Sequence, residues 1–374
     1  MRTAFCRKSL GGLLAPLLVA IVIETATAQD LGTDIAGLNL CLWGDCEARG
    51  AYAADPYGFT NPATMPVGSL PYLQRGVISS GSYFRLNSGG VGVHIGSGSA
   101  TAVAAPWVFQ VSAIYAEGGG ALPVLSGTDL SLRTRLVRLA AAVDLGRTAL
   151  ELKGLSVGLL AGVPGTTSDL RVRVQGFTVV DSHETHEIGL TPGVHWRSGE
   201  RDWFAVGAFF DVERHHQKTD LFDPFTFASS QRQGTSNAWF SRVGTSVLPF
   251  VPLDLADSSS VRGEYLGWVR IGADIEYRNV SAMGAPTRRQ TIGYLGVETP
   301  LLPDAWNPLS RYLRVHLLGG VDTSRGWGVG AGLYGSGVMQ FLSCNPAYSS
   351  RPLAKSLGNL ADVWSATCAV VMPL

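Results

Sequence analysis

Arg270-Ile271-Gly272-Ala273-Asp274-Ile275-Glu276-Tyr277-Arg278 is the stretch that decides the fold. Successive side chains of a β-strand point to opposite faces. One face of this segment would therefore carry Ile271, Ala273, Ile275 and Tyr277, and the other would carry Arg270, Asp274, Glu276 and Arg278 around Gly272. The alternation predicts a strand between an apolar and a polar environment.

Three other segments alternate in the same way. Residues 187–196 set Ile188, Leu190, Val194 and Trp196 against Glu187, Thr191 and His195, and residues 312–317 set Leu313, Val315 and Leu317 against Tyr312, Arg314 and His316. Residues 170–175 set Leu170, Val172 and Val174 against Arg171, Arg173 and Gln175. The phase shifts at Gly176, where we expect a β-bulge.

The composition indicates which environment the apolar faces meet. Charged residues make up 16% of the chain, against a typical quarter, and 46 of 374 residues are glycine. A soluble all-β protein needs polar outer faces, whereas a barrel in lipid needs apolar ones, so the low charge favours the barrel. A soluble secreted β-protein is the alternative. The net charge of zero gives no electrostatic reason to expect nucleic acid as a partner.

Aromatic residues bracket three of the apolar faces. The pairs are Trp107 with Tyr115, Tyr265 with Tyr277, and Trp327 with Phe341. About nine residues of tilted strand cross the hydrocarbon layer, so such pairs would lie at the two membrane interfaces. They predict an aromatic girdle in contact with membrane lipid.

Period-two segments continue along residues 77–374, which we expect to form the barrel. The strands are expected near 77–86, 91–97, 107–115, 133–145, 154–163, 170–180, 186–196, 203–214, 236–248, 263–278, 288–299, 312–321, 326–341 and 362–372. The predicted fold is an all-β transmembrane antiparallel β-barrel of about 14 strands (12–14), an even number as in bacterial barrels. The ring must close, because an open edge in lipid leaves backbone groups unpaired.

Two segments precede the barrel. Residues 1–28 combine a basic start, an apolar stretch and an Ala26-Thr27-Ala28 site before Gln29, which predicts a secretory signal cleaved between Ala28 and Gln29. A retained membrane anchor is the alternative. Residues 29–76 are rich in Gly, Ala and Pro without a sustained period, and are expected to form a compact irregular segment. Together these features place the protein in a Gram-negative outer membrane.

Four cysteines follow the signal. Their spacing suggests two local disulfides, Cys41 with Cys46 and Cys344 with Cys368, among three possible connectivities. Cys41 and Cys46 also have the spacing of half a metal site, but no second Cys or His pair stands near them in the sequence. We therefore favour the disulfide.

A family resemblance enters at residues 48–65, which read ARGAYAADPYGFTNPATM. This stretch resembles the N-terminal hatch of FadL-like outer-membrane transporters of hydrophobic compounds, where an acidic residue leads to Asn-Pro-Ala-x-Met. Asn61, Pro62, Ala63 and Met65 match that motif, and residues 294–298 and 326–330 look like the last hairpins of the family. PorV-like barrels, which are not established fatty-acid transporters, share this start. Asn61-Pro62-Ala63 equally fits a plain turn into the first strand.

The resemblance implies passive uptake of a small hydrophobic ligand of the fatty-acid or aromatic-hydrocarbon class. Residues 29–76 would plug the lumen, and a strand kink at Gly176 or Pro192 would open it sideways. The chain ends at Leu374 instead of on the aromatic residue that the barrel-insertion machinery reads, which leaves the last strand's position open. The alternative is a non-transporting barrel that acts as scaffold or partner of a secretion or assembly system through loops such as residues 218–236.

Several short patterns match the sequence motifs of catalytic, nucleotide-binding or metal sites without their structural context. Residues 154–158 match G-x-S-x-G but lack the helix that a nucleophile elbow needs, and Gly330, Gly332 and Gly335 match G-x-G-x-x-G without a βαβ unit. His183-Glu184-x-His186 and His215-His216 are expected to be exposed loop residues rather than metal ligands. We predict no enzyme activity, catalytic residue, cofactor or metal.

Overall fold

The computed structural model describes residues 61–68, 75–86, 89–121, 127–198, 203–223, 227–251, 266–281, 287–300, 313–322, 327–335, 342–349 and 363–373. Several predictions fall outside these ranges. They concern the signal with its cleavage site at Ala28 and Gln29, the Cys41–Cys46 bridge, residues 29–60 of the expected plug, Tyr265 and Phe341.

Antiparallel strands make up most of the described chain. They are β1 (Arg75–Leu86), β2 (Gly89–Ala104), β3 (Trp107–Ala121), β4 (Thr128–Asp144), β5 (Leu155–Gly162), β6 (Thr167–Val174), β7 (Phe177–Arg197), β8 (Phe204–Asp223), β9 (Ala228–Val247), β10 (Arg270–Ser281), β11 (Arg288–Pro300), β12 (Leu313–Asp322), β13 (Trp327–Gly335), β14 (Leu342–Ser349) and β15 (Val363–Pro373). Short helical turns are η1 (Pro62–Thr64), α3 (Met65–Gly68) and η2 (Leu145–Arg147). No helix among the described residues is long and apolar enough to cross a membrane.

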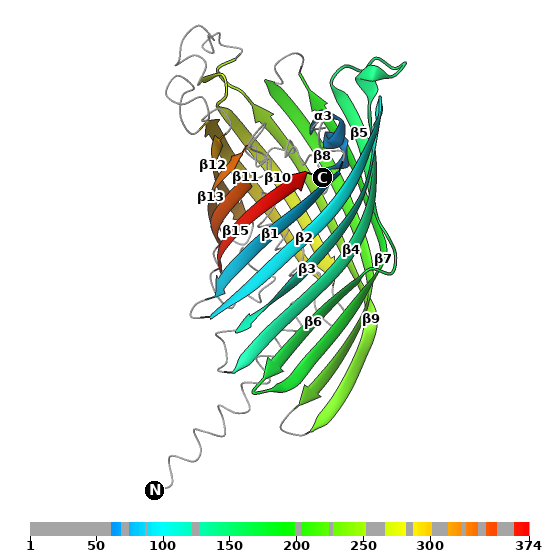
Figure 1. The fold of residues 1–374 in the computed structure, drawn as a ribbon, viewed down its shortest axis with the longest axis vertical. Helices are drawn as coiled ribbons and strands as arrows, with labels where there is room; N and C mark the ends of the chain where they lie inside the picture. The colour runs from blue at the N-terminus through cyan, green and yellow to red at the C-terminus, as the bar shows by residue number, and fades with distance from the viewer. Residues whose placement is uncertain are drawn as a thin grey trace.

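The strands form one closed ring (Figure 1). β15 pairs with β1, and β3 pairs with β4, so the sheet has no free edge among the described strands. β5 and β6 both lie between β4 and β7 and run in the same direction, so they share one place in the ring. The fifteen segments therefore fill fourteen places, which confirms the predicted barrel.

Two boundary errors cancel in the predicted strand count. The predicted strand at 154–163 and residues 170–174 of the next one share one place, because β5 and β6 are halves of an interrupted strand, and residues 177–180 already belong to β7. In contrast, β14 was missed. Its sequence does not alternate cleanly and contains Pro346, which argues against a strand. The ring closes through β15, so the last strand lies where it was expected despite the unusual C-terminus.

The bulge predicted at Gly176 is wrong. Gln175 and Gly176 form the two-residue turn between β6 and β7, and both have a positive φ, 50° and 88°. Positive φ at both central residues is the geometry of the type I′ turns that suit the twist of hairpins. The phase shift in the sequence therefore marks a reversal of the chain.

The strand faces have the polarity of a barrel in lipid. On β10, Asp274 and Glu276 are buried on the inner side, whereas Ile275 is 63% exposed on the outer side. On β7, Ile188, Leu190 and Val194 are exposed, and His195 is buried. Polar residues therefore face inward and apolar residues face outward, as the sequence predicted.

Aromatic side chains mark one rim of this apolar surface. The "η1 end" is the end of the barrel where β1 starts, and η1 and α3 lie there (Figure 1). Four exposed tryptophans stand where strands start or finish at this end, namely Trp107, Trp196, Trp203 and Trp268. Trp239 and Trp327 are exposed farther toward the "far end", which holds the β6–β7 turn.

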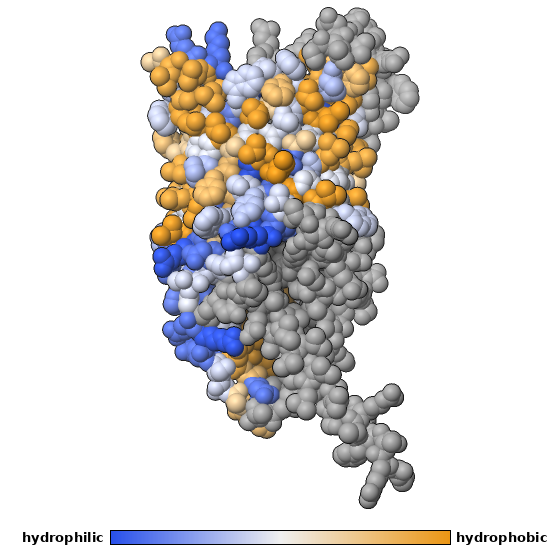
Figure 2. Space-filling view, turned by 180° about the vertical axis from the view of Figure 1, so that it is seen from behind, coloured by the Kyte–Doolittle hydropathy of each residue, from blue (hydrophilic) through white to orange (hydrophobic). Residues whose placement is uncertain are grey.

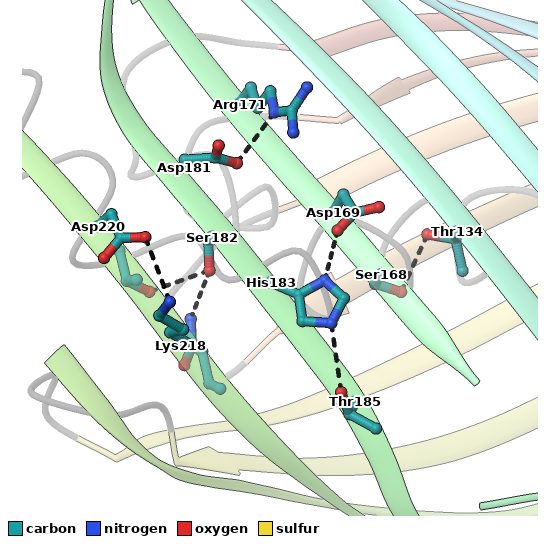
Figure 3. Close-up of polar contacts among 12 residues, drawn as sticks. Thr134, Ser168, Asp169, Arg171, Asp181, Ser182, His183, Thr185, Lys218 and Asp220 are labelled. Atoms are coloured by element: carbon teal, nitrogen blue, oxygen red, sulfur yellow. Dashed lines mark hydrogen bonds and ion pairs between the residues drawn. The ribbon is translucent and has the colours of Figure 1, made fainter. Parts of the chain in front are cut away.

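The polarity reverses near the far end. On β6, Leu170 and Val172 are buried inside, whereas Arg171 and Arg173 are exposed outside. Figure 2 shows the change as a largely hydrophobic upper surface followed by a hydrophilic band. The outer face of this band carries ion pairs such as Arg171 with Asp181 at 3.0 Å, seen in Figure 3. On β4, β6 and β7, the apolar outer surface therefore lies toward the η1 end, and the polar band lies toward the far end.

Candidate functional site

The predicted hatch motif lies against the inner wall. Asn61 and residues 62–64 are buried, and Met65 is buried among the inward-facing Val108, Ala140, Ala142 and Leu160. Asn61 caps η1, because its Oδ1 accepts a hydrogen bond from the Ala63 N–H at 3.1 Å. Its Nδ2 donates to the carbonyl of Val194 on β7 at 3.3 Å. Asn61 therefore shapes the turn and also ties it to the barrel.

Two facing glycines make room for the motif. Gly158 of β5 and Gly193 of β7 are partners in the register. A Cβ on Gly158 would lie 2.6 Å from the carbonyl carbon of Pro62, and one on Gly193 would lie 2.1 Å from Oδ1 of Asn61. These two glycines form the "η1 seat". Gly158 thus has a packing role within the G-x-S-x-G pattern, whose Ser156 is buried in β5.

The strand next to this seat is interrupted. Between β5 and β6, residues 163–166 face only two residues of β4, because Gly162 pairs with Arg138 and Thr167 pairs with Arg135. Hydrogen bonds persist on both sides of this "break", from Val163 N to Val137 O at 2.8 Å and from Gly165 N to His186 O at 2.9 Å. The break is therefore a wide bulge held at its rims.

The irregularity continues into the neighbouring strands. The β7–β8 register shifts between His186 and Ile188, and the pairing skips Thr191 and Pro192. Proline has no N–H to donate, which accounts for the second interruption. Of the two residues predicted to open the wall, Pro192 thus lies at an interrupted ladder beside the break, whereas Gly176 lies in the turn at the far end.

Polar side chains line the inner wall beside the break. Thr191 donates to Asp211 at 2.7 Å, Arg138 lies 3.8 Å from Glu213, and His215 lies 3.4 Å from Glu213. The rings of His186 and His215 are stacked with centroids 4.9 Å apart.

The prediction of exposed loop histidines is wrong. His183 is exposed but belongs to β7, and His186 and His215 are buried on the inner faces of β7 and β8. His186 shares a strand face with Glu184, and His215 shares one with Gln217, because each pair is two residues apart. In a barrel the inward face is polar, so these shared polar faces were the signal that we missed. Within the described ranges, no group of three His, Cys, Asp or Glu side chains is placed to hold a metal ion.

A second polar cluster lines β9 and β10. Arg242 donates through Nε to Asp274 at 2.7 Å and lies 3.8 Å from Glu276, which also pairs with Arg278. The Arg242 guanidinium stands 5.4 Å from the ring centre of Tyr294 on β11. These charged side chains are thus paired where they are buried.

Two sequence patterns become features of the last strands. Gly330, Gly332 and Gly335 lie in β13, with no helix following among the described residues. Cys344 on β14 is the register partner of Cys368 on β15. Directly opposed residues in an antiparallel pair are about 4.5–5.5 Å apart at Cα, within the range of disulfides. The register therefore suits the predicted bridge.

Comparison with known proteins adds a likeness of fold. No family model matches the sequence, and no curated protein matches it. A FadL homologue from Pseudomonas aeruginosa is 10% identical, with 89% of this chain and 96% of that chain covered, at a TM-score of 0.50. The toluene transporters TbuX of Ralstonia pickettii (11% identity, 88% and 95% covered) and TodX of P. putida (10%, 88% and 99%) both give 0.48. At these identities the likeness concerns the fold alone, and the chain is an outer-membrane-type β-barrel similar in fold to the FadL homologue.

Proposed function

We propose that the protein is a passive channel for small hydrophobic molecules of the fatty-acid or aromatic-hydrocarbon class in the outer membrane. The observation that carries the proposal is the position of the break. It lies beside the η1 seat, at the level where the outer surface changes from apolar to polar. A solute that leaves the lumen there enters lipid from the side.

The level of the break follows from the strands around it. On β4, Val137 and Leu139 are exposed apolar residues on the side of the η1 end, and Arg133 and Arg135 are exposed on the side of the far end. On β7, the exposed apolar Ile188 lies on the side of the η1 end, and the exposed polar His183 lies on the side of the far end. Transfer of a hydrophobic solute from water to lipid lowers its free energy, so an exit at this boundary favours release.

The segment at the η1 seat would provide the closure. A hydrophobic solute needs an apolar path, and an open water-filled lumen would admit polar solutes as well. Met65 adds an apolar side chain to the small cluster at the wall. We infer that residues 29–76 plug the lumen, with residues 61–65 as the anchored part.

Two measurements test this function. Cells that produce the protein should take up 1-N-phenylnaphthylamine, a dye that fluoresces in phospholipid, faster than cells with an empty vector. Proteoliposomes with a variant lacking residues 29–68, which spares β1, should swell faster in small sugars than those with the full protein. Dye uptake at the vector rate argues against the channel, and unchanged swelling argues against the plug.

A scaffold role is the second candidate, favoured by the polar outer band. Residues 218–236, expected as a loop, belong mostly to β8 and β9, and their far-end parts present an exposed polar face. Such a face suits contact with another envelope protein. Saturable binding of a hydrophobic ligand to the purified protein supports the channel, whereas a stable envelope partner without ligand binding supports the scaffold.

A further inference from the structure

We propose that the side chain of His186 is the gate of the break, and that the structure shows it closed. The inference rests on the proposed channel and adds the residue that controls the lateral exit. Three observations carry it. They are the backbone bonds of His186, the two glycines on which its ring rests, and the lack of hydrogen bonds of normal geometry to that ring.

The backbone of His186 holds the rim of the break. Its N–H donates to the carbonyl of Thr166 at 2.8 Å, and its carbonyl accepts from the N–H of Gly165 at 2.9 Å. The β7–β8 register shift begins at the same residue. His186 is therefore fixed at the break by its main chain, whatever its side chain does.

The ring of His186 rests on two bare glycines. Gly162, the last residue of β5, and Gly189 of β7 are register partners. A Cβ on Gly162 would lie 2.0 Å from Cε1 of His186, and one on Gly189 would lie 2.5 Å from Nε2. The imidazole thus covers the inner face of the wall at the edge of the break.

The ring is held there mainly by packing. Neither ring nitrogen makes a hydrogen bond of normal geometry among the described residues, although His186 is only 5% exposed. Its other contact is the stack on His215. By comparison, the ring of His183 is bound by Asp169 at 2.6 Å and Thr185 at 3.4 Å (Figure 3).

This arrangement suits a movable closure. A buried polar group without a partner is unfavourable, so the ring recovers hydrogen bonds when it turns away from the glycines. Turning breaks no hydrogen bond of normal geometry and leaves the backbone contacts at the rim in place. The wall beside the break is then covered only by Gly162 and Gly189, which have no side chains.

Gly162→Ala tests the gate without touching His186. The new methyl group takes the place of the ring, so the ring must leave. Cells with this variant should take up the dye several-fold faster than wild type. His186→Ala should give the same rise, and the double variant should rise no further. Gly293→Ala is the matched control, because a Cβ there meets nothing within 4 Å.

A second readout follows the ring directly. Hydrogen–deuterium exchange at Cε1–H, measured by mass spectrometry on the purified barrel, should be slower for His186 than for the exposed His183 in wild type. In Gly162→Ala the rate for His186 should rise toward that of His183. Heat-modifiable migration in electrophoresis checks that each variant folds, and His186→Ala tests the gate if Gly162→Ala does not.

The outcomes separate the gate from the channel. If wild-type uptake exceeds that of the vector but both variants match wild type, the gate is overturned and the channel stands. An additive rise in the double variant also overturns the gate, because the two changes would then act separately. If wild-type uptake equals that of the vector, the channel fails, and the gate fails with it.

Discussion

Two glycine pairs show how single residues position the candidate site. Gly158 and Gly193 admit the Asn61 turn, and Gly162 and Gly189 admit the His186 ring. Each pair removes side chains from the inner wall, so a neighbouring group can approach the backbone closely. A methyl group at one of these positions is therefore a specific perturbation.

Replacing Gly193 should loosen the η1 seat. In Gly193→Ala the new Cβ would overlap Oδ1 of Asn61, so the bond to Val194 is lost. We expect faster swelling of proteoliposomes in small sugars, approaching the rate of the variant without residues 29–68. Gly98→Ala on β2, where a Cβ meets nothing within 4 Å, should swell like wild type. Equal rates for Gly193→Ala, Gly98→Ala and wild type would rule out this role of the seat.

The buried Arg242–Asp274 pair should contribute strongly to stability. Both side chains are almost fully buried, 3% and 0% exposed. Asp274→Ala leaves the Arg242 charge with a weaker set of partners, and breaking such a pair costs about 3–5 kcal/mol. The midpoint of urea unfolding in detergent should fall accordingly, and Asp169→Ala on the exposed face should change it little. A midpoint close to wild type for Asp274→Ala would contradict this view of the cluster.

At the scale of elements, the alternation of polar and apolar residues predicted most strands and their faces. Arg270, Asp274 and Ile275 lie on the predicted sides, because polar side chains face the lumen and apolar side chains face lipid. The pattern could not distinguish a bulge from a hairpin at Gly176, since both change the phase. Nor could it show that residues 163–166 interrupt one strand, because the register depends on the partners across the sheet.

The candidate site was only partly predictable for the same reason. Asn61, Pro62, Ala63 and Met65 were found through the resemblance, and Pro192 was proposed with it as a strand kink. His186 was misjudged, because its environment depends on glycines that lie far away in the sequence or across a bulge. Its burial follows from the barrel's inward face and was not visible in the local pattern.

Shortening the break should close the lateral exit. Deleting Pro164 and Gly165 leaves two residues opposite the two on β4, so β5 and β6 can pair as one strand. We expect a folded barrel whose dye uptake falls to the vector rate, because the exit is gone. Gly98→Ala on β2, where a Cβ meets nothing within 4 Å, serves as the control and should leave dye uptake unchanged. Unchanged uptake after the deletion would place the exit elsewhere.

For the whole molecule, the account depends on an apolar outer band that meets lipid and a polar band that meets water. Ile275→Arg places a charge on the lipid-facing side, where the cost is about 2–4 kcal/mol near the bilayer midplane. Gln231→Arg lies on the exposed polar part of β9 and should cost little. Refolding yields in liposomes should separate the two variants. Equal yields would contradict the assignment of the bands.

The most direct measurement is the behaviour of the purified, processed protein with and without detergent. A closed barrel with an apolar outer surface should need detergent or lipid to stay dispersed, and should migrate faster in electrophoresis before boiling than after it. A protein that remains monodisperse in buffer alone, with one mobility before and after boiling, would contradict the account.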